Sequence, residues 1–354
     1  MKPDISVIMS VYNGETYLEE AIESIRNQTF KNWELIVIND CSKDRTGEIL
    51  ENFTRLDDRI KVHANEVNLK LPASLNKAIA LSSGKYIARM DADDISLPDR
   101  LKKQFEFMEE NTDISLSSCR FMTVKNGVYM SGGAGGRCDN DALKTMLLLA
   151  NPILHPGVIA KAEIMKKYKY DTTLTCTEDL ELWTRMVTNN EKIEILPECL
   201  LIYRLHDKQI TSTTLERQHT EVLKIQEKYY GALLRKMDEK MADFYISGIY
   251  FKETMDLEKF LEYAKWLRRV SAKNFDKNTI NYALFEILAE YKRCGVAKRD
   301  VLKAMFNFSP CFLVKEILRR KKTAKKDIEK CMNVAYDLGL RKTAGTSEFP
   351  IFEK

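Results

Sequence analysis

The sequence predicts an α/β fold: a doubly wound, mostly parallel sheet followed by an all-helical C-terminal region. From residue 5 onward, short apolar runs that suit buried strands alternate with segments whose apolar residues recur at helical spacing. Six of the eight prolines lie before residue 200, so the front of the chain is rich in turns and the back is not. Alternation of strand and helix at this spacing is typical of a parallel sheet.

The expected elements follow one another along the chain. Strands are predicted over 5–11, 33–39, 60–63 and 85–90, with helices over 18–25 and 44–56 and from Pro72 and Pro98 onward, since proline suits the first turn of a helix. The pattern then predicts strand-like pieces over 114–130, a helix over 178–189, short strands over 193–204 and helices from about 213. The glycine-rich segment SGGAGGR at 131–137 is interpreted as a flexible linker in preference to a mobile lid that orders on a ligand.

Composition excludes several classes of protein. Hydrophobic residues make up 44% and charged residues 31% of the 354 residues, which is typical of a globular protein and excludes disorder. No apolar run approaches the ~20 residues that span a bilayer. The N-terminus lacks the features of a signal peptide, so a cytoplasmic location is expected. The eight cysteines are scattered without a C-x-x-C pair, and we expect reduced thiols there, not a zinc site or a disulfide framework.

The net charge of +4 conceals an uneven distribution. Residues 211–354 contain 29 Lys and Arg against 20 Asp and Glu, a net +9, which leaves −5 for residues 1–210. The basic excess is greatest near the C-terminus, and residues 312–330 combine it with apolar side chains. This segment predicts either a peripheral contact with anionic lipid at the inner face of the cell membrane or, with equal weight, a solvated helix face. Nucleic acid is not expected as a partner, because the excess is local.

Carboxylates, not phosphate-binding glycines, stand where the predicted parallel strands end. Neither G-x-x-x-x-G-K-[ST] nor G-x-G-x-x-G follows the first strand. Asp40 follows the second strand, and Asp91, Asp93 and Asp94 follow the strand over 85–90, at the edge where open parallel sheets bind ligands. Since carboxylates repel phosphates, a nucleotide there requires a bridging divalent cation such as Mn²⁺ or Mg²⁺. Alone, the acidic run is equally well explained as the start of a helix.

Five ordered motifs run through residues 5–212. They read SVIMSVYNGETYLEEAIESIRNQTFKNWELIVINDCSKDRT, NLKLPASLNKAIALSSGKYIARMDADDISLPDRL, NPILHPGVI, TEDLELWTRM and LLIYRLH. In these motifs the chain resembles glycosyltransferase family 2, whose members have the GT-A fold. The resemblance implies a GT-A domain over 1–212, with a nucleotide-binding half (1–110) and an acceptor half (111–212), followed by a helical C-terminal domain over 213–354.

The resemblance also implies a reaction. A sugar moves from a nucleotide diphosphate sugar, with a UDP-sugar favoured and a UDP-hexose expected, to an acceptor hydroxyl, with inversion at the anomeric carbon. The acceptor is expected to be a saccharide or a lipid-linked saccharide in capsule, O-antigen or exopolysaccharide assembly. Mn²⁺ or Mg²⁺ stabilises the charge of the departing diphosphate.

Individual residues receive roles through the same motifs. Asp93 matches the direct metal ligand and Asp91 the acid near the ribose and metal. His206 matches a metal ligand of some relatives, and a structural or acceptor-contacting role is an equal alternative for it. The nucleotide-binding residues implied are Ser10, Tyr12, Glu15, Asp40, Lys70 and Asp91. Tyr12 is suited to stack on a base, and Asp40 matches the acid that accepts a hydrogen bond from the uracil ring.

The motif TEDLELW supplies the implied general base. An inverting transfer needs a group that takes the acceptor's proton, and the family's Glu-Asp pair matches Glu178 and Asp179, with Asp179 as the base. The residues alone favour another explanation, a helix N-cap box with Thr177 as the cap. Acceptor-contacting or supporting roles are expected for Glu178, His155, Trp183 and Arg204.

Two departures from the family pattern affect the nucleotide site. The turn after the second strand reads Asn-Asp-Cys-Ser at 39–42, which keeps the second acid and loses a glycine. Ser74-Leu75-Asn76 replaces a stretch in which many relatives have an arginine, which leaves phosphate contacts open. Two other classes compete with the glycosyltransferase: a nucleotidyltransferase, although YNGET is not a triphosphate-binding loop, and a non-catalytic nucleotide- or carbohydrate-binding module.

Overall fold

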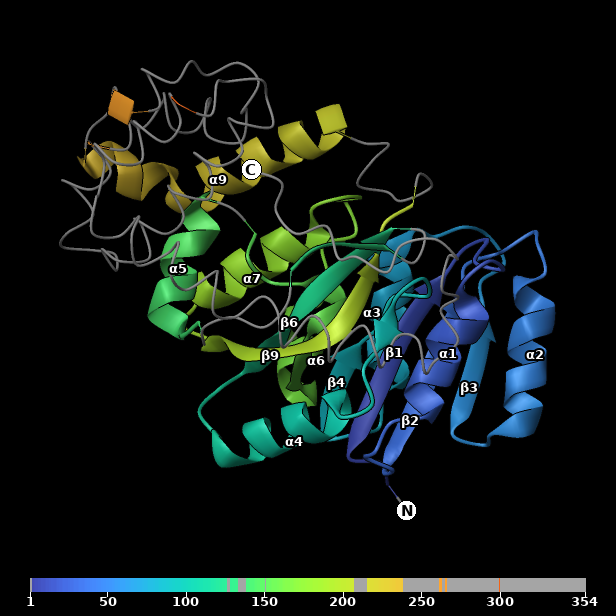
Figure 1. The fold of residues 1–354 in the computed structure, drawn as a ribbon. Helices are drawn as coiled ribbons and strands as arrows, with labels where there is room; N and C mark the ends of the chain where they lie inside the picture. The colour runs from blue at the N-terminus through green and yellow to red at the C-terminus, as the bar shows by residue number, and fades with distance from the viewer. Residues whose placement is uncertain are drawn as a thin grey trace.

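The computed structural model describes residues 2–125, 128–132, 138–149, 151–206 and 215–237, with the isolated positions 261, 262, 265 and 299. A single mixed sheet stands at the centre of this part of the chain, and helices cover both of its faces (Figure 1). A further long helix, α9, lies beyond α7 and α5, away from the sheet (Figure 1). The fold is therefore the α/β arrangement that the sequence predicts, with at least one helix after it.

Nine strands form the sheet, in the order β3-β2-β1-β4-β8-β6-β9-β5, with β7 paired to β6. The strands are β1 Ile5–Val11, β2 Trp33–Asn39, β3 Ile60–Ala64, β4 Tyr86–Arg89, β5 Ile95–Ser96, β6 Leu116–Lys125, β7 Val128–Gly132, β8 Ile159–Lys161 and β9 Ile193–Arg204. β3, β2, β1 and β4 are parallel neighbours, as are β6 and β9, whereas β8, β7 and β5 pair antiparallel to their neighbours. The carboxyl ends of the first four strands consequently meet at one edge.

Each face of the sheet has its own hydrophobic core. The helices are α1 Leu18–Arg26, α2 Thr46–Leu56, α3 Leu71–Leu81, α4 Arg100–Glu110, α5 Asn140–Leu149, α6 Ala162–Tyr168, α7 Glu178–Thr188 and α9 Leu215–Met237. Alternate residues of β1 point to opposite faces: Val7 and Met9 pack with α1, α2 and α4, whereas Ile8 packs with α3, α5, α6, α7 and α9. The period of two in the strands thus determines which helices share a core.

The structure confirms the predicted elements of the first 110 residues and corrects some later ones. α5 and α6 were not expected, and residues 193–204 form one strand where short pieces were predicted. The pairing of β9 with β6 shifts register between Ser118 and Arg120, and Pro197 lies in this irregularity, where proline is tolerated. Of the glycine-rich segment, residues 133–137 lie outside the described residues. No helix within the described ranges is long and apolar enough to cross a membrane.

A close approach of two backbones makes Gly84 a test of the packing of β1. A Cβ atom at Gly84 would lie 2.6 Å from the backbone nitrogen of Ser6 and 2.9 Å from the carbonyl carbon of Ile5. We expect Gly84→Ala to lower the free energy of unfolding by about 1–3 kcal/mol, the usual cost of overpacking, measured by denaturant unfolding.

Gly47 is the matched control for this substitution. A Cβ there meets nothing closer than Asn39 Nδ2 at 3.8 Å, and the residue lies in α2. Gly47→Ala should be neutral or stabilising by up to about 1 kcal/mol, because alanine is the better helix former. Equal unfolding midpoints for Gly84→Ala and the wild type would contradict the close packing of β1 against residue 84.

Candidate active site

Three carboxylates converge in the turn between β4 and β5. Asp91, Asp93 and Asp94 each place an oxygen atom within 4.8 Å of the others. β4 ends at Arg89, so the turn begins at the carboxyl edge of the parallel strands, where the sequence predicts the site. The acidic run is therefore a cluster in space and does not begin a helix, since α4 starts only at Arg100.

A buried arginine holds the first of these acids. Arg89 is 3% exposed and forms an ion pair with both carboxylate oxygens of Asp91, the distance from Arg89 Nη1 to Asp91 Oδ2 being 2.5 Å. Arg100, itself fully buried, donates from Nη2 to the carbonyl oxygen of Arg89 at 2.6 Å. Burial raises the pKa of Asp91 to about 6, although Arg89 works to lower it.

The other two acids meet the end of β9. Asp94 is fully buried, and its Oδ1 accepts the N–H of Arg204 at 2.9 Å. Its Oδ2 is buried without a hydrogen-bond partner among the described residues, and burial, reinforced by Asp93, raises the pKa of Asp94 well above its usual range. Asp93 is more exposed, and its Oδ2 lies 2.9 Å from Nε2 of His206. Two segments 110 residues apart therefore build one site.

These residues fit a divalent cation. The cluster offers carboxylate oxygens together with one imidazole nitrogen, which is a donor set suited to Mn²⁺ and, through its oxygens, to Mg²⁺. The Oδ2 of Asp94 is buried without a hydrogen-bond partner among the described residues and lies beside two further carboxylates, and a cation would offset their negative charge. Asp91, Asp93 and His206, the residues predicted to be metal ligands, all lie here.

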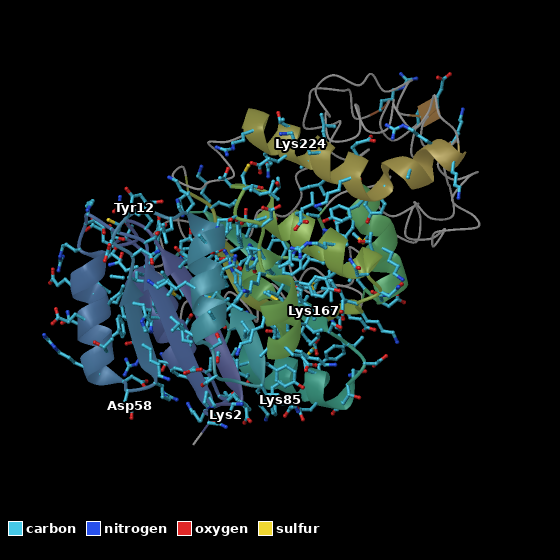
Figure 2. All side chains as sticks on the ribbon, turned by 180° about the vertical axis from the view of Figure 1, so that it is seen from behind. Lys2, Tyr12, Asp58, Lys85, Lys167 and Lys224 are labelled. Carbon is cyan, nitrogen blue, oxygen red and sulfur yellow. The ribbon has the colours of Figure 1, made fainter. Side chains whose placement is uncertain are left out.

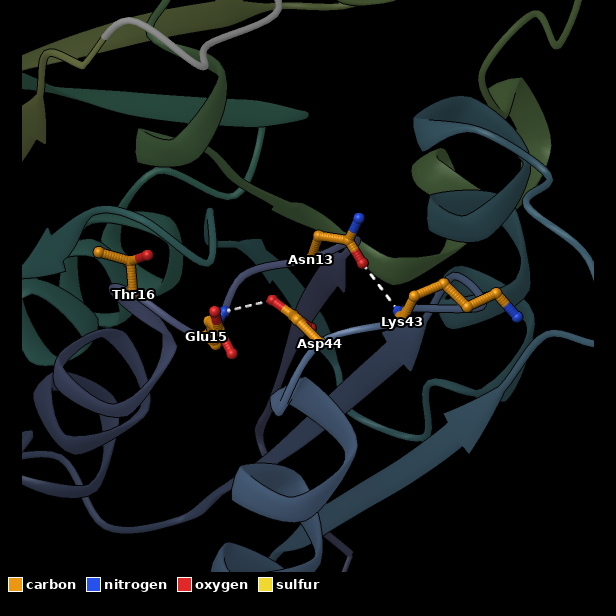
Figure 3. Close-up of a pocket in the computed structure, with 5 residues that line it drawn as sticks. All are labelled: Asn13, Glu15, Thr16, Lys43 and Asp44. Atoms are coloured by element: carbon orange, nitrogen blue, oxygen red, sulfur yellow. Dashed lines mark hydrogen bonds between the residues drawn. The ribbon is translucent and has the colours of Figure 1, made fainter.

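The loop after β1 is bonded to the loop after β2. Oδ1 of Asn13 accepts the N–H of Lys43 at 2.8 Å, and the N–H of Glu15 donates to Asp44 at 3.1 Å (Figure 3). Three more bonds join Asn13 N–H to Ser42 Oγ, Gly14 N–H to Thr46 Oγ1 and Arg45 N–H to Glu15 Oε2. A pocket of about 300 Å³ lies against these loops. Glu15, predicted to contact nucleotide, braces one wall through the Arg45 N–H.

Tyr12 and Ser10 lie at the carboxyl end of β1. The Tyr12 side chain is 51% exposed and stands at the opposite end of the sheet from Lys2, Asp58 and Lys85 (Figure 2). An exposed ring at this edge is free to stack on a planar base. Ser10 is half-buried within β1, so it contributes at most the edge of a pocket.

Asp40 anchors a third loop at this edge. Its carboxylate is 2% exposed and accepts hydrogen bonds from Asn65 Nδ2 and from the N–H groups of Leu69 and Lys70, at 2.8, 2.8 and 2.9 Å. Lys70 has φ 71° and ψ 166°, a conformation costly for a residue with a side chain. Cys41 replaces the glycine of the related turn and keeps a left-handed φ of 65°. The departure therefore leaves the turn conformation in place.

The predicted base stands in the first turn of α7. Asp179 accepts a hydrogen bond from Asn151 Nδ2 at 2.8 Å and from the N–H of Leu180 at 2.7 Å. Burial raises the pKa of Asp179 above its usual value, and the bond to Leu180 opposes this. Glu178 is more buried, at 5% exposure, and burial together with Asp179 raises its pKa to about 8. Both carboxyl groups therefore have a raised pKa, and Asp179 is the more exposed of the pair.

The structure contradicts the N-cap box as the explanation of TEDLELW. Thr177 occupies the N-cap position of α7 but makes no side-chain cap hydrogen bond. Its hydroxyl donates instead to Glu221 of α9 at 2.8 Å. The orientation of Asp179 in the first turn is therefore set by its bonds to Asn151 and to the N–H of Leu180, not by a capping box.

The remaining predicted residues are supporting ones in this arrangement. His155 is buried, its Nε2 lies 2.7 Å from the Tyr170 hydroxyl, and burial lowers its pKa well below the usual range. Trp183 is fully buried and meets the His155 ring edge-on at 5.9 Å, which excludes a direct contact with an acceptor in this conformation. Arg204 is buried, pairs with Glu20 and lies 4.9 Å over the Tyr17 ring.

Two residues of the site escaped the sequence analysis. Arg89 could have been found from the sequence, because an arginine inside an apolar strand requires a buried partner. For Asn151 the sequence holds a weaker signal. Its Oδ1 accepts the N–H of Ile153 at 3.2 Å, which leaves the amide NH₂ directed at Asp179. That pairing joins positions 28 residues apart and has no local pattern.

Comparison with known proteins places this geometry in a family. Residues 6–162 match the family described as Glycosyl transferase family 2. An uncharacterized glycosyltransferase of Methanocaldococcus jannaschii is 36% identical over 253 residues, which cover 71% of this chain and 84% of that protein. The chain belongs to glycosyltransferase family 2. A second relative, the O-antigen biosynthesis glycosyltransferase WbnJ of Escherichia coli, is 33% identical over 217 residues, 60% of this chain and 83% of the relative.

Solved structures of lower identity share the GT-A fold of this family 2 chain. TarS of S. aureus, residues 1–349 in complex with UDP-GlcNAc, aligns with a TM-score of 0.55 at 17% identity, covering 89% of this chain and 92% of that one. The mannosyltransferase PcManGT from Pyrobaculum calidifontis, in complex with GDP-Man and Mn²⁺, aligns with a TM-score of 0.53 at 15% identity, covering 90% and 88%. The predicted fold and family are thus confirmed.

The raised pKa of Glu178 predicts a pH-dependent cost to stability. A carboxylic acid whose folded-state pKa is about 8, against a usual 4.5, favours folding fully below pH 4.5 and loses that contribution as the pH rises through 8. Glu178→Gln removes the titration, so its Tm relative to wild type should be higher at pH 8 than at pH 5.

Differential scanning calorimetry at the two pH values measures this difference. Glu106→Gln, at an exposed position of α4, serves as the control and should show no pH-dependent offset. An offset for Glu178→Gln that is the same at pH 5 and pH 8 would rule out a protonated Glu178.

Proposed function

We propose that this chain is an inverting, divalent-metal-dependent glycosyltransferase that moves a sugar, with a UDP-hexose as the favoured donor, onto an acceptor hydroxyl in the assembly of a surface polysaccharide. The observation that carries the proposal is the meeting of two acidic groups at one edge of the sheet. Burial and the neighbouring Asp93 raise the pKa of Asp91, and the charge of Asp179 adds to this, which supports one site for the predicted base and the cluster of Asp91, Asp93 and Asp94. Such a transfer requires a site for the metal and the nucleotide, and a base beside it.

Relatives and structural neighbours support the class of substrate. Relatives at 30% identity or more carry names in O-antigen and teichuronic acid biosynthesis. The neighbours of similar fold hold UDP, UDP-GlcNAc or GDP-Man, one of them with Mn²⁺. Family membership makes the chain a transferase of sugars, so the nucleotidyltransferase and the non-catalytic module are no longer candidates.

In the proposed reaction, Asp179 takes the proton of the acceptor hydroxyl. Asn151 orients its carboxylate, and its pKa is raised by burial, which strengthens it as a base. Burial and Asp179 raise the pKa of Glu178, which disfavours a second negative charge beside the base. Asp91 and Asp93, with His206, would hold the cation, and its charge would stabilise the departing nucleoside diphosphate. Tyr12 and the braced loops of Glu15 and Asp40 form the nucleoside side.

Residues 312–330, predicted to contact anionic lipid, lie outside the described residues. A location at the inner face of the cell membrane, the boundary of a helical domain at 212 and 213 and a lipid-linked acceptor remain parts of the proposal.

The assignment of the cation site is tested with Asp93→Ala. The substitution removes the more exposed carboxylate of the cluster and the partner of His206, so metal-dependent nucleotide binding should weaken by more than about tenfold, or 1.4 kcal/mol. Calorimetric titration of UDP and GDP in the presence and absence of Mn²⁺ measures it. Asp113→Ala, at a surface ion pair with Lys192, is the control. The same Mn²⁺ dependence in Asp93→Ala and the wild type would remove Asp93 from the site.

The assignment of the base is tested with Asp179→Asn. The amide keeps the size of the side chain and loses the proton acceptor, so turnover should fall by roughly 10²–10⁴, while nucleotide binding with Mn²⁺ persists. Release of nucleoside diphosphate from UDP-glucose, UDP-N-acetylglucosamine and GDP-mannose gives the rate. Asp58→Asn, at the opposite end of the sheet, should be silent (Figure 2). Turnover near the wild-type rate in Asp179→Asn would refute this role.

A further inference from the structure

Helix α9 reaches the segment that precedes the proposed base. It lies across α7 on the side away from the sheet, and its residues Val222 and Ile225 enter the core that α7 shares with the sheet (Figure 1). Glu221, one residue before Val222, is 6% exposed. A carboxylate buried at a helix contact requires hydrogen-bond donors, and their positions show what it holds.

Among the residues that the structure describes, the donors to Glu221 from outside α9 belong to three consecutive positions. Glu221 accepts the hydroxyl proton of Thr177 at 2.8 Å and contacts Cys176 Sγ at 3.3 Å. The N–H groups of Thr175 and Cys176 point at the same carboxylate at 3.4 Å. Arg217, one turn earlier on α9, pairs with the other side at 3.2 Å. One carboxylate thus gathers residues 175–177, immediately before Glu178 and Asp179.

The charge state of Glu221 suits this role. Burial works to raise its pKa, but the bonds from Thr177, Cys176 and Thr175 outweigh burial and hold the pKa below the usual range. The carboxylate is therefore ionised at neutral pH and accepts every one of these hydrogen bonds. Charge-assisted bonds of this kind are stronger than bonds between neutral groups.

A second contact fixes the direction of α9 relative to α7. Glu181, 2% exposed and two residues after the base, accepts a hydrogen bond from the Tyr229 hydroxyl and lies 3.6 Å from Lys228. The two carboxylates point in opposite senses: Glu221 reaches from α9 to the start of α7, and Glu181 reaches from α7 to α9. Together they restrain both the position and the rotation of the first turn of α7.

We propose that Glu221 is a positioning residue for the base: it holds residues 175–177 so that the carboxylate of Asp179 meets Asn151 and faces the acceptor. The inference rests on the proposed function. It makes α9, which lies beyond residues 6–162 of the family match, a working part of the active site. Misplacement of a catalytic group by about 1 Å is enough to cost about 100-fold in rate.

The kinetic test compares Glu221→Ala and Glu221→Gln with Glu227→Gln. Glu227 is a matched control on the same helix, because its carboxylate pairs with Arg235 at an exposed position. Nucleoside diphosphate release from UDP-glucose, UDP-N-acetylglucosamine and GDP-mannose is followed, with water as the acceptor. Glu221→Ala should lower kcat at least about tenfold and leave KM for the donor within about twofold. Glu221→Gln keeps one acceptor oxygen for Thr177 and should be intermediate, and Glu227→Gln should equal the wild type.

An epistasis measurement separates positioning from general loss of structure. In an Asp179→Asn background the base is absent, so Glu221→Ala should cause no further loss in the residual rate. The same fold-loss in both backgrounds would show a merely structural role and overturn the inference, as would an unchanged kcat in Glu221→Ala.

A measurement independent of turnover completes the test. Amide hydrogen exchange in Glu221→Ala should be faster in peptides covering 175–180 and unchanged in β1 and β2, whereas unchanged exchange over 175–180 contradicts the anchor. Failure of the proposed function looks different. In that case the wild-type protein neither binds UDP or GDP with Mn²⁺ nor releases them from the donors, while the exchange result still decides whether Glu221 holds the segment.

Discussion

The ion pair between Arg89 and Asp91 is the interaction on which the rest of the site depends. Arg89 sits at the end of β4, between β1 and β8, and is 3% exposed. Burying a guanidinium costs free energy unless an acid pairs with it, and both carboxylate oxygens of Asp91 pair with Arg89. Arg100 holds the carbonyl oxygen of Arg89, and the Arg89 N–H bonds to Val158, so strand, turn and α4 are locked together. These contacts fix the start of the turn, and Asp93 and Asp94 follow in the same turn.

Excess negative charge is the second constraint. Arg89 and Arg100 are outnumbered by the acids of the turn and of α7. Burial raises the pKa of Asp91, Asp94 and Glu178, and the neighbouring acids raise these values further. A structure maintained for stability alone gains nothing from such a cluster, because apolar residues of the same volume cost less to bury. Titratable groups with strongly displaced pKa values in one place are typical of catalytic sites, and a divalent cation with an anionic ligand is their natural complement.

Sequence reasoning recovered what is encoded locally. β1, β2, α1 and the acidic turn were predictable because period, punctuation and residue type act over a few positions, and the family motifs located Asp179. The contacts that orient these groups were not. Thr177 has every local feature of an N-cap, yet its hydroxyl is taken by Glu221, 44 residues later. Asn151 and Asp179 meet only because α5 and α7 pack together. α6 was missed because seven residues carry too little periodicity.

The division of the chain into an acidic front and a basic back now has a more specific meaning. If the helical part served only to bind an acceptor or a membrane, its contacts with the front would be those of any packed helix, apolar and replaceable. Instead, the buried, ionised carboxylate of Glu221 on α9 accepts hydrogen bonds from the three residues before the base. The carboxylate of Glu181 on α7 accepts a hydrogen bond from Tyr229 on α9. A buried carboxylate is costly unless its hydrogen-bond donors are in place, so each of these contacts demands one geometry. The arrangement therefore fits a requirement for position more than for stability, and the position concerned is that of Asp179.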